Sequence, residues 1–173
     1  MRAWARAADV ATSPATAPPL PRLSLTLAPA ELVLNVVSLK GEYRVTPVVG
    51  VALRAAAGTY STKEFEGVTL LETGGQLAWY VLGDFGKGLQ LALDLRHAWN
   101  WTKVELVRGE GTRVRAALLV GAKWSGPRGT TLEAQAGYGV RRSEGISTSS
   151  IDKAGYRHTS LEPRIELGLG WSL

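Results

Sequence analysis

Alternation of apolar and polar residues with a period of two runs through most of this chain. The clearest stretch is 89–102, where Leu, Leu, Leu, Leu, His, Trp and Trp alternate with Gln, Ala, Asp, Arg, Ala, Asn and Thr. This spacing places the two sets on opposite faces of a strand and does not fit a helix. The same pattern is found at 23–27, 37–46, 49–56, 76–82, 113–124, 131–141 and 161–173. The sequence therefore predicts an all-β fold of eight strands.

The connections between these strands alternate between short and long. Turn residues occupy 46–47, 83–88 and 125–129, and longer polar segments occupy 59–75, 103–112 and 142–159. Short turns at one end and long loops at the other are typical of an eight-stranded antiparallel up-and-down transmembrane β-barrel. The first connection, at 28–32, is short and departs from this plan. Pro163 predicts a strand start or a bulge, because proline cannot donate to a strand ladder.

The 173 residues divide into a tail and one domain. Residues 1–20 form an Ala/Pro-rich stretch without periodicity, which predicts a flexible tail, and 21–173 form the β-barrel domain. The tail lacks an uninterrupted apolar core, so we expect an export signal to lie upstream of Met1 or to have been removed. The chain has no Cys, which excludes disulfides, thiolate metal sites and cysteine nucleophiles. No apolar run is long enough for a membrane-spanning helix.

The polar face carries charges of both signs among small residues. Gly and Ala have little to offer a solvated surface, but they leave room for long side chains inside a narrow eight-stranded barrel. Buried charges persist only when they are paired, and this mixture allows pairing across the lumen. We therefore predict a lumen charge network formed by Lys40, Glu42, Arg44, Arg54, Asp94, Arg96, Arg113, Arg115, Glu133, Glu162, Arg164 and Glu166, with Lys123 on the same face.

Tryptophans lie at both ends of the apolar face. Trp99 and Trp101 lie near the long loops, and Trp124 and Trp171 lie near the short turns. Indole rings at both edges of an apolar band are typical of membrane-interface aromatics in outer-membrane barrels. The alternative is a soluble calycin- or lipocalin-like barrel, in which the same leucines and tryptophans would line a cavity for a small hydrophobic ligand.

The region from Leu23 to Leu173 resembles the small eight-stranded bacterial outer-membrane barrels, including the outer membrane protein A barrel and uncharacterised outer-membrane β-barrel domain proteins. The resemblance is carried by the short opening strand, by Gly41-Glu42-Tyr43 before a tight turn, and by the last strand from Ile165 to Leu173. It implies a porin-like protein of the Gram-negative outer membrane, folded by the barrel-assembly machinery. Its implied roles are structural, surface-interacting, narrow channel-like or lipid A-modifying. Family members usually end in an aromatic residue, whereas this chain ends in Leu173 with Trp171 two places earlier.

Few residues carry catalytic chemistry. His158, Ser160 and Glu162 share one strand face and would suit ester hydrolysis, so an outer-membrane lipid A hydrolase is a second alternative. Same-face neighbours lie roughly 7 Å apart, however, and the trio falls on the inferred lumen side. We expect a non-enzymatic protein without catalytic residues. With two histidines, and with His97 on the apolar face, we also expect no metal and no cofactor.

The expected partners are outer-membrane lipid and lipopolysaccharide. Lipopolysaccharide phosphates would bind basic residues near the long loops, which are Lys103, Arg108, Arg113, Arg141, Arg142, Lys153 and Arg157. The net charge of +5 does not indicate nucleic acid, because most strand Lys and Arg lie on the inferred lumen face without aromatic platforms. We expect a monomer.

Overall fold

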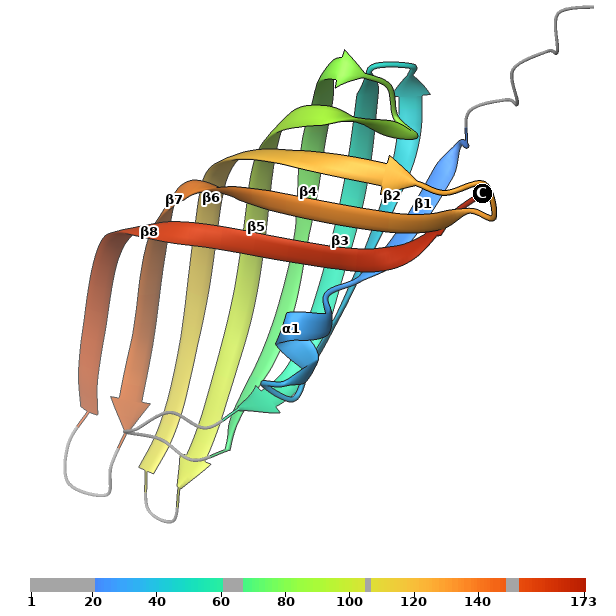
Figure 1. The fold of residues 1–173 in the computed structure, drawn as a ribbon. Helices are drawn as coiled ribbons and strands as arrows, with labels where there is room; N and C mark the ends of the chain where they lie inside the picture. Colours follow the sequence, from blue (N-terminus) through green and yellow to red (C-terminus); the bar gives the residue numbers. More distant parts are fainter. Residues whose placement is uncertain (1–20, 61–66, 105–106, 149–152) are drawn as a thin grey trace, which may run out of the picture.

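The computed structural model describes residues 21–60, 67–104, 107–148 and 153–173. Eight strands follow one another in chain order in one antiparallel sheet, and the last strand pairs with the first to close a barrel (Figure 1). The predicted all-β architecture of eight antiparallel strands is confirmed. The elements are β1 Leu23–Leu27, α1 Pro29–Leu32, β2 Val36–Thr46, β3 Val49–Tyr60, β4 Val68–Gly83, β5 Lys87–Val104, β6 Val107–Ser125, β7 Thr130–Thr148 and β8 Lys153–Ser172.

The register fixes how the barrel closes. Starting at Leu25 and following directly paired residues through all eight strands leads to Leu161. Leu25 itself pairs with Trp171, so the offset around the barrel is 171 − 161 = 10 residues. An offset of this size tilts the strands to about 40° from the barrel axis and leaves an interior that side chains can fill.

The strands extend further toward the long-loop end than the sequence predicts. β4 begins at Val68, β5 ends at Val104, β6 begins at Val107 and β7 ends at Thr148. The predicted loops over 59–75, 103–112 and 142–159 were therefore too long. Near this end the outward positions also become polar, as at Glu110 and Arg142, so the contrast between the two faces disappears from the sequence.

The expectation for Pro163 was wrong: it lies inside β8, where the pairing with β7 continues without a register shift. Proline is tolerated here because β8 has a neighbour on one side only. The short connection between β1 and β2 contains the helix α1. β1 ends at Leu27, so its pairing with β8 begins at Leu169.

The barrel has a polar interior and an apolar exterior. The lumen side chains include buried charges such as Glu42, Asp94 and Lys123, with small residues such as Ala52 and Ala117 between them. Large apolar side chains, Leu and Val above all, are exposed around the outside of every strand. This is the face assignment that the sequence predicts.

Candidate functional site: the filled lumen

The predicted lumen charges come together because every second residue of each strand points into the barrel. The strands supply alternate side chains to the interior, and the register places these side chains in tiers across the lumen. Small residues make the tiers possible: a Cβ on Gly50 would overlap the Glu42 carboxylate. The lumen is therefore packed largely by charge pairs, beside a small buried apolar cluster around Tyr80, Phe85 and Leu119.

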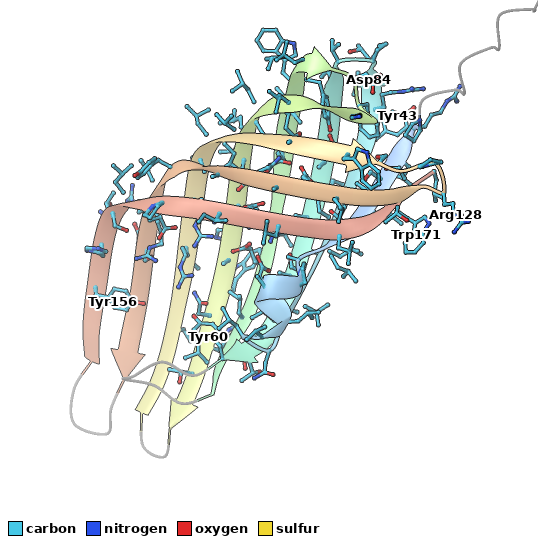
Figure 2. The ribbon with its side chains drawn as sticks, viewed as in Figure 1. Tyr43, Tyr60, Asp84, Arg128, Tyr156 and Trp171 are labelled. Carbon is cyan, nitrogen blue, oxygen red and sulfur yellow. The ribbon has the colours of Figure 1, made fainter. Side chains whose placement is uncertain are left out.

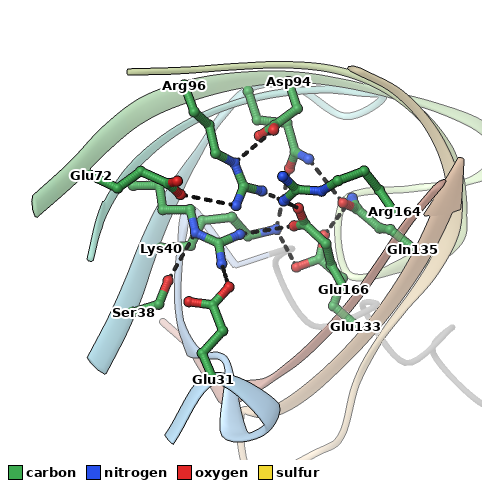
Figure 3. A network of polar contacts seen from close by, with 12 residues as sticks. Glu31, Ser38, Lys40, Glu72, Asp94, Arg96, Glu133, Gln135, Arg164 and Glu166 are labelled. Atoms are coloured by element: carbon green, nitrogen blue, oxygen red, sulfur yellow. Dashed lines mark hydrogen bonds and ion pairs between the residues drawn. The ribbon is translucent and has the colours of Figure 1, made fainter. Parts of the chain in front are cut away.

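The central network consists of Arg54, Glu72, Asp94, Arg96, Arg164 and Glu166, from the four strands β3, β4, β5 and β8 (Figure 3). Arg96 donates from Nε to Asp94 Oδ2 at 2.7 Å and from Nη1 to Glu72 Oε1 at 3.3 Å, and Nη2 pairs with Glu166. Arg164 also pairs with Glu166. One buried guanidinium thus joins three carboxylates across the barrel, and charge-assisted hydrogen bonds of this kind are the strong ones.

Arg54 extends the central network to the helix α1. Its Nη1 donates to Glu166 Oε2 at 2.9 Å and its Nε donates to Ser38 Oγ at 2.8 Å. Its Nη2 pairs with the carboxylate of Glu31, which reaches in from α1. A residue outside the sheet thus completes the contacts of this guanidinium.

A second tier lies beside the central network and combines one ion pair with amides. Lys40 pairs with Glu133 and donates to Gln76 Oε1 at 3.2 Å. Gln90 and Gln135 each donate to Glu133 Oε1 at 2.8 Å. Gln76 in turn donates to Gln135 Oε1 at 2.9 Å, so hydrogen bonds link all five side chains, although Gln90 Oε1 is buried without a partner.

The short-turn end of the lumen is closed by a compact group. Lys123 Nζ donates to Glu42 Oε2 at 2.7 Å, and Tyr80 Oη donates to Glu42 Oε1 at 2.8 Å. Phe85 folds in from the turn between β4 and β5, is fully buried, and lies with its ring centroid 3.7 Å from Lys123 Nζ. Asp84 holds this turn by accepting from the backbone N–H of Gly86 at 2.8 Å.

At the long-loop end, arginines outnumber their acidic partners. Glu162 bridges Arg115 at 2.7 Å and Arg141 at 3.0 Å. Arg115 also lies 3.8 Å from Glu72, which links this tier to the central network. Arg115 and Arg141 are direct cross-strand neighbours, and Glu162 offsets their repulsion.

Ten of the twelve predicted network residues form ion pairs, all except Arg44 and Arg113. These two are half-buried and have no ion pair within the described part of the chain. Sequence reasoning missed two acids, Glu72 and Glu31. Glu72 lies an even number of positions from Gln76 and Ala78 and so faces inward like them, but it fell in the segment predicted as a loop. Glu31 lies in a one-turn helix, which the alternating pattern of the sequence does not predict.

The aromatic side chains lie at both ends of the exterior. Trp101 is exposed near the long loops, Trp99 beside it is half-buried, and Trp124 and Trp171 are exposed near the short turns. Figure 2 shows Tyr43 and Trp171 at one end of the barrel and Tyr60 and Tyr156 at the other. Trp171 Nε1 donates to the Arg128 carbonyl at 3.2 Å, which gives the indole N–H a partner at the rim.

The three residues considered for ester hydrolysis do not form a connected site. Glu162 is held by arginines, and among the described residues no hydrogen bond joins it to His158 or Ser160. Ser160 lies opposite Arg141, and His158 lies opposite Ser143. The arrangement therefore offers no base for the Ser160 hydroxyl.

The basic residues proposed to bind lipopolysaccharide are only partly described. Arg142 and Arg157 both pair with Glu144 on the outer surface, at 2.7 and 2.9 Å, whereas Arg141 points into the lumen toward Glu162. The side chains of Lys103, Arg108 and Lys153 lie outside the described part of the structure.

The fold and the site together define a closed eight-stranded barrel with a charged, filled interior and an apolar exterior. No family model, no curated protein and no solved structure matches this chain. In the described ranges, no group of three or more His, Asp or Glu side chains is placed to hold a metal ion. Nor is any helix there long and apolar enough to cross a membrane.

Proposed function

We propose that this chain is a non-enzymatic integral outer-membrane β-barrel of a Gram-negative bacterium, with the leucine face in lipid. The observation that carries the proposal is an exterior band without Asp, Glu, Lys or Arg. The outward positions of the band fall within 23–27, 37–45, 49–59, 69–81, 89–101, 112–124, 132–140 and 159–171. A surface that faces water has no reason to exclude charge from all eight strands.

The height of this band suits a bilayer. On β5 the band runs from Leu89 to Trp101, which is roughly 40 Å along the strand. Because the strands are tilted by about 40° from the barrel axis, this corresponds to a height of roughly 30 Å along the axis. That height is close to the hydrocarbon thickness of a membrane. The four residue pairs that join β1 to β8 also support the proposal, because they remove the open sheet edge along this part of the seam, and lipid offers no partners for such an edge.

The filled lumen favours a structural or surface-interaction role over a conducting one. The tiers around Arg96, Glu133 and Lys123 are buried and hydrogen-bonded, and Phe85 closes the short-turn end. An apolar ligand cavity, which the soluble alternative needs, would require the opposite placement of the two faces. The outer Arg142–Glu144–Arg157 group lies just beyond the band, where it could contact lipopolysaccharide head groups.

The first test is electrophoretic migration with and without boiling after refolding into detergent micelles, alongside solubility in detergent-free buffer. We expect a heat-dependent shift and detergent-dependent solubility. A monomer that dissolves without detergent and shows no shift would overturn the membrane proposal. Planar-bilayer recordings of the folded protein should give no discrete openings, and regular openings would instead favour the channel-like role.

A further inference from the structure

The barrel wall has a notch beside β8. β1 ends at Leu27, so β8 has β7 as a partner from Lys153 onward but is paired with β1 only from Leu169. On the other side of the opening, β2 begins at Val36. We call the space between Leu27, the start of β2 and the Ile165–Gly168 part of β8 the notch. The lumen side chains of β8 next to it, Glu162 to Gly168, are half-buried, whereas Asp94 and Arg96 are buried.

The helix α1 lies in the notch, between β2 and β8 (Figure 1). It has four residues, begins with Pro29, has no side-chain cap and buries none of its residues. Its last residue Leu32 and the following Val33 and Leu34 are exposed. A helix of one turn with no buried side chain and no cap has little intrinsic stability, so α1 can be displaced at low cost.

One charged contact ties α1 to the lumen. The Glu31 carboxylate pairs with Arg54 Nη2 (Figure 3). The Glu31 side chain is 31% exposed and the Arg54 side chain 7%, so this acid reaches the guanidinium from the open side of the wall. Arg54 keeps Glu166 and Ser38 as partners if Glu31 leaves. The position of Glu31 is therefore one that a carboxylate from elsewhere could fill.

The lining of the notch changes from charged to apolar. A cavity of about 50 Å³ lies between α1 and the strands, with Lys40, Arg54 and Glu166 on its inner side. Leu27, Ile165 and Leu167 also line it and belong to the apolar exterior of the barrel. A molecule with an anionic head and an apolar chain would match both parts of this lining, with the head on Arg54 and the chain among the leucines.

We propose that the notch binds a long-chain carboxylate that enters from the membrane, with its head group replacing Glu31 on Arg54. Glu31 and α1 occupy the site in the absence of this ligand. The inference rests on the proposed membrane location, because the apolar chain of the ligand must lie against the outer face of the barrel.

The test is a fluorescence titration of the full chain, refolded in zwitterionic micelles, with a 16-carbon fatty acid that carries a terminal pyrene. The alcohol of the same length and label serves as the uncharged probe. We expect the ionised acid to bind roughly tenfold more tightly than the alcohol. Glu31→Gln should tighten acid binding by roughly tenfold because it removes the competing carboxylate, and Arg54→Gln should abolish the preference for the acid.

Glu144→Gln is the matched control, because Glu144 forms a comparable ion pair on the outer surface away from the notch. It should leave the titration unchanged. Equal binding of acid and alcohol, or no effect of Glu31→Gln, would overturn the notch proposal. Should Arg54→Gln fail to fold, the Glu31→Gln comparison decides alone.

Heat-dependent migration of the same samples separates the two proposals. Protein that shifts on boiling but does not distinguish acid from alcohol contradicts the notch site and leaves the membrane barrel standing. Protein that dissolves without detergent and shows no shift contradicts both.

Discussion

Lys123 and Glu42 form the most deeply buried ion pair of the lumen, with side chains 0% and 1% exposed. Removing two such charges from water is costly, and their attraction repays the cost only when the remaining hydrogen-bonding capacity is also used. Here Tyr80 occupies the second Glu42 oxygen, and the Phe85 ring faces the ammonium group. The pair is therefore sensitive to the loss of either partner.

At this position Lys123→Met should lower the free energy of unfolding by about 3–5 kcal/mol, because it leaves the Glu42 carboxylate buried without a cation. The double variant Lys123→Met/Glu42→Gln should lose less than Lys123→Met alone. Urea unfolding of the micelle-folded protein measures both. Arg142→Met, which breaks the exposed pair with Glu144, is the control and should cost less than about 1 kcal/mol. Equal losses at the two sites would contradict this account of the lumen.

The alternation of inward and outward residues along each strand is enough to predict which charges face the lumen, but not which of them form ion pairs with one another. Lys40 and Glu133 lie 93 positions apart in the sequence, and their contact depends on strand register and barrel offset. Glu31 could not be predicted at all, because it reaches Arg54 from a one-turn helix outside the periodic pattern. The composition of the network was thus largely readable from the sequence, whereas its connections were not.

Among the elements, β1 limits closure of the barrel. It has five residues, and only four pairs join it to β8, from Leu27–Leu169 to Ser24–Ser172. The sequence predicts this short strand and the existence of all eight strands correctly. It does not predict how far β4 to β8 extend, because outward residues near the loops are as polar as inward ones.

The seam between β1 and β8 gives a prediction with a matched control on one strand face. A Cβ at Gly170 would overlap the Leu25 backbone and lie 2.7 Å from Thr26 Cα, whereas at Gly168 its nearest neighbour would be Thr26 Cβ at 3.4 Å. Gly170→Ala should therefore lower the free energy of unfolding by about 1–3 kcal/mol through overpacking, and should reduce the heat-resistant form on gels. Gly168→Ala should change it by less than about 0.5 kcal/mol. If both variants behave alike, the seam is not as tight as the register indicates.

In the molecule as a whole, the polar face of the sheet points inward and the apolar face points outward, the reverse of the arrangement in a water-soluble barrel. The interior is held mainly by ion pairs and amide hydrogen bonds, and most of the large apolar side chains lie outside. An apolar exterior of this extent favours association with other apolar surfaces, and the buried apolar cluster around Phe85 is small. Lipid around the band would cover the apolar exterior and leave the lumen network to specify the shape.

This arrangement of the two faces predicts a depth-dependent cost of charge on the exterior. Leu118 lies at the middle of the band on β6 and is 70% exposed, and Thr112 lies on the same face at the long-loop edge. In a bilayer, Leu118→Arg should cost about 2–4 kcal/mol, and Thr112→Arg about 0–1 kcal/mol. Reversible unfolding from lipid vesicles measures both free energies. In water an exposed Leu118→Arg change would be nearly neutral, so equal small effects at the two positions would place the leucine face outside the membrane.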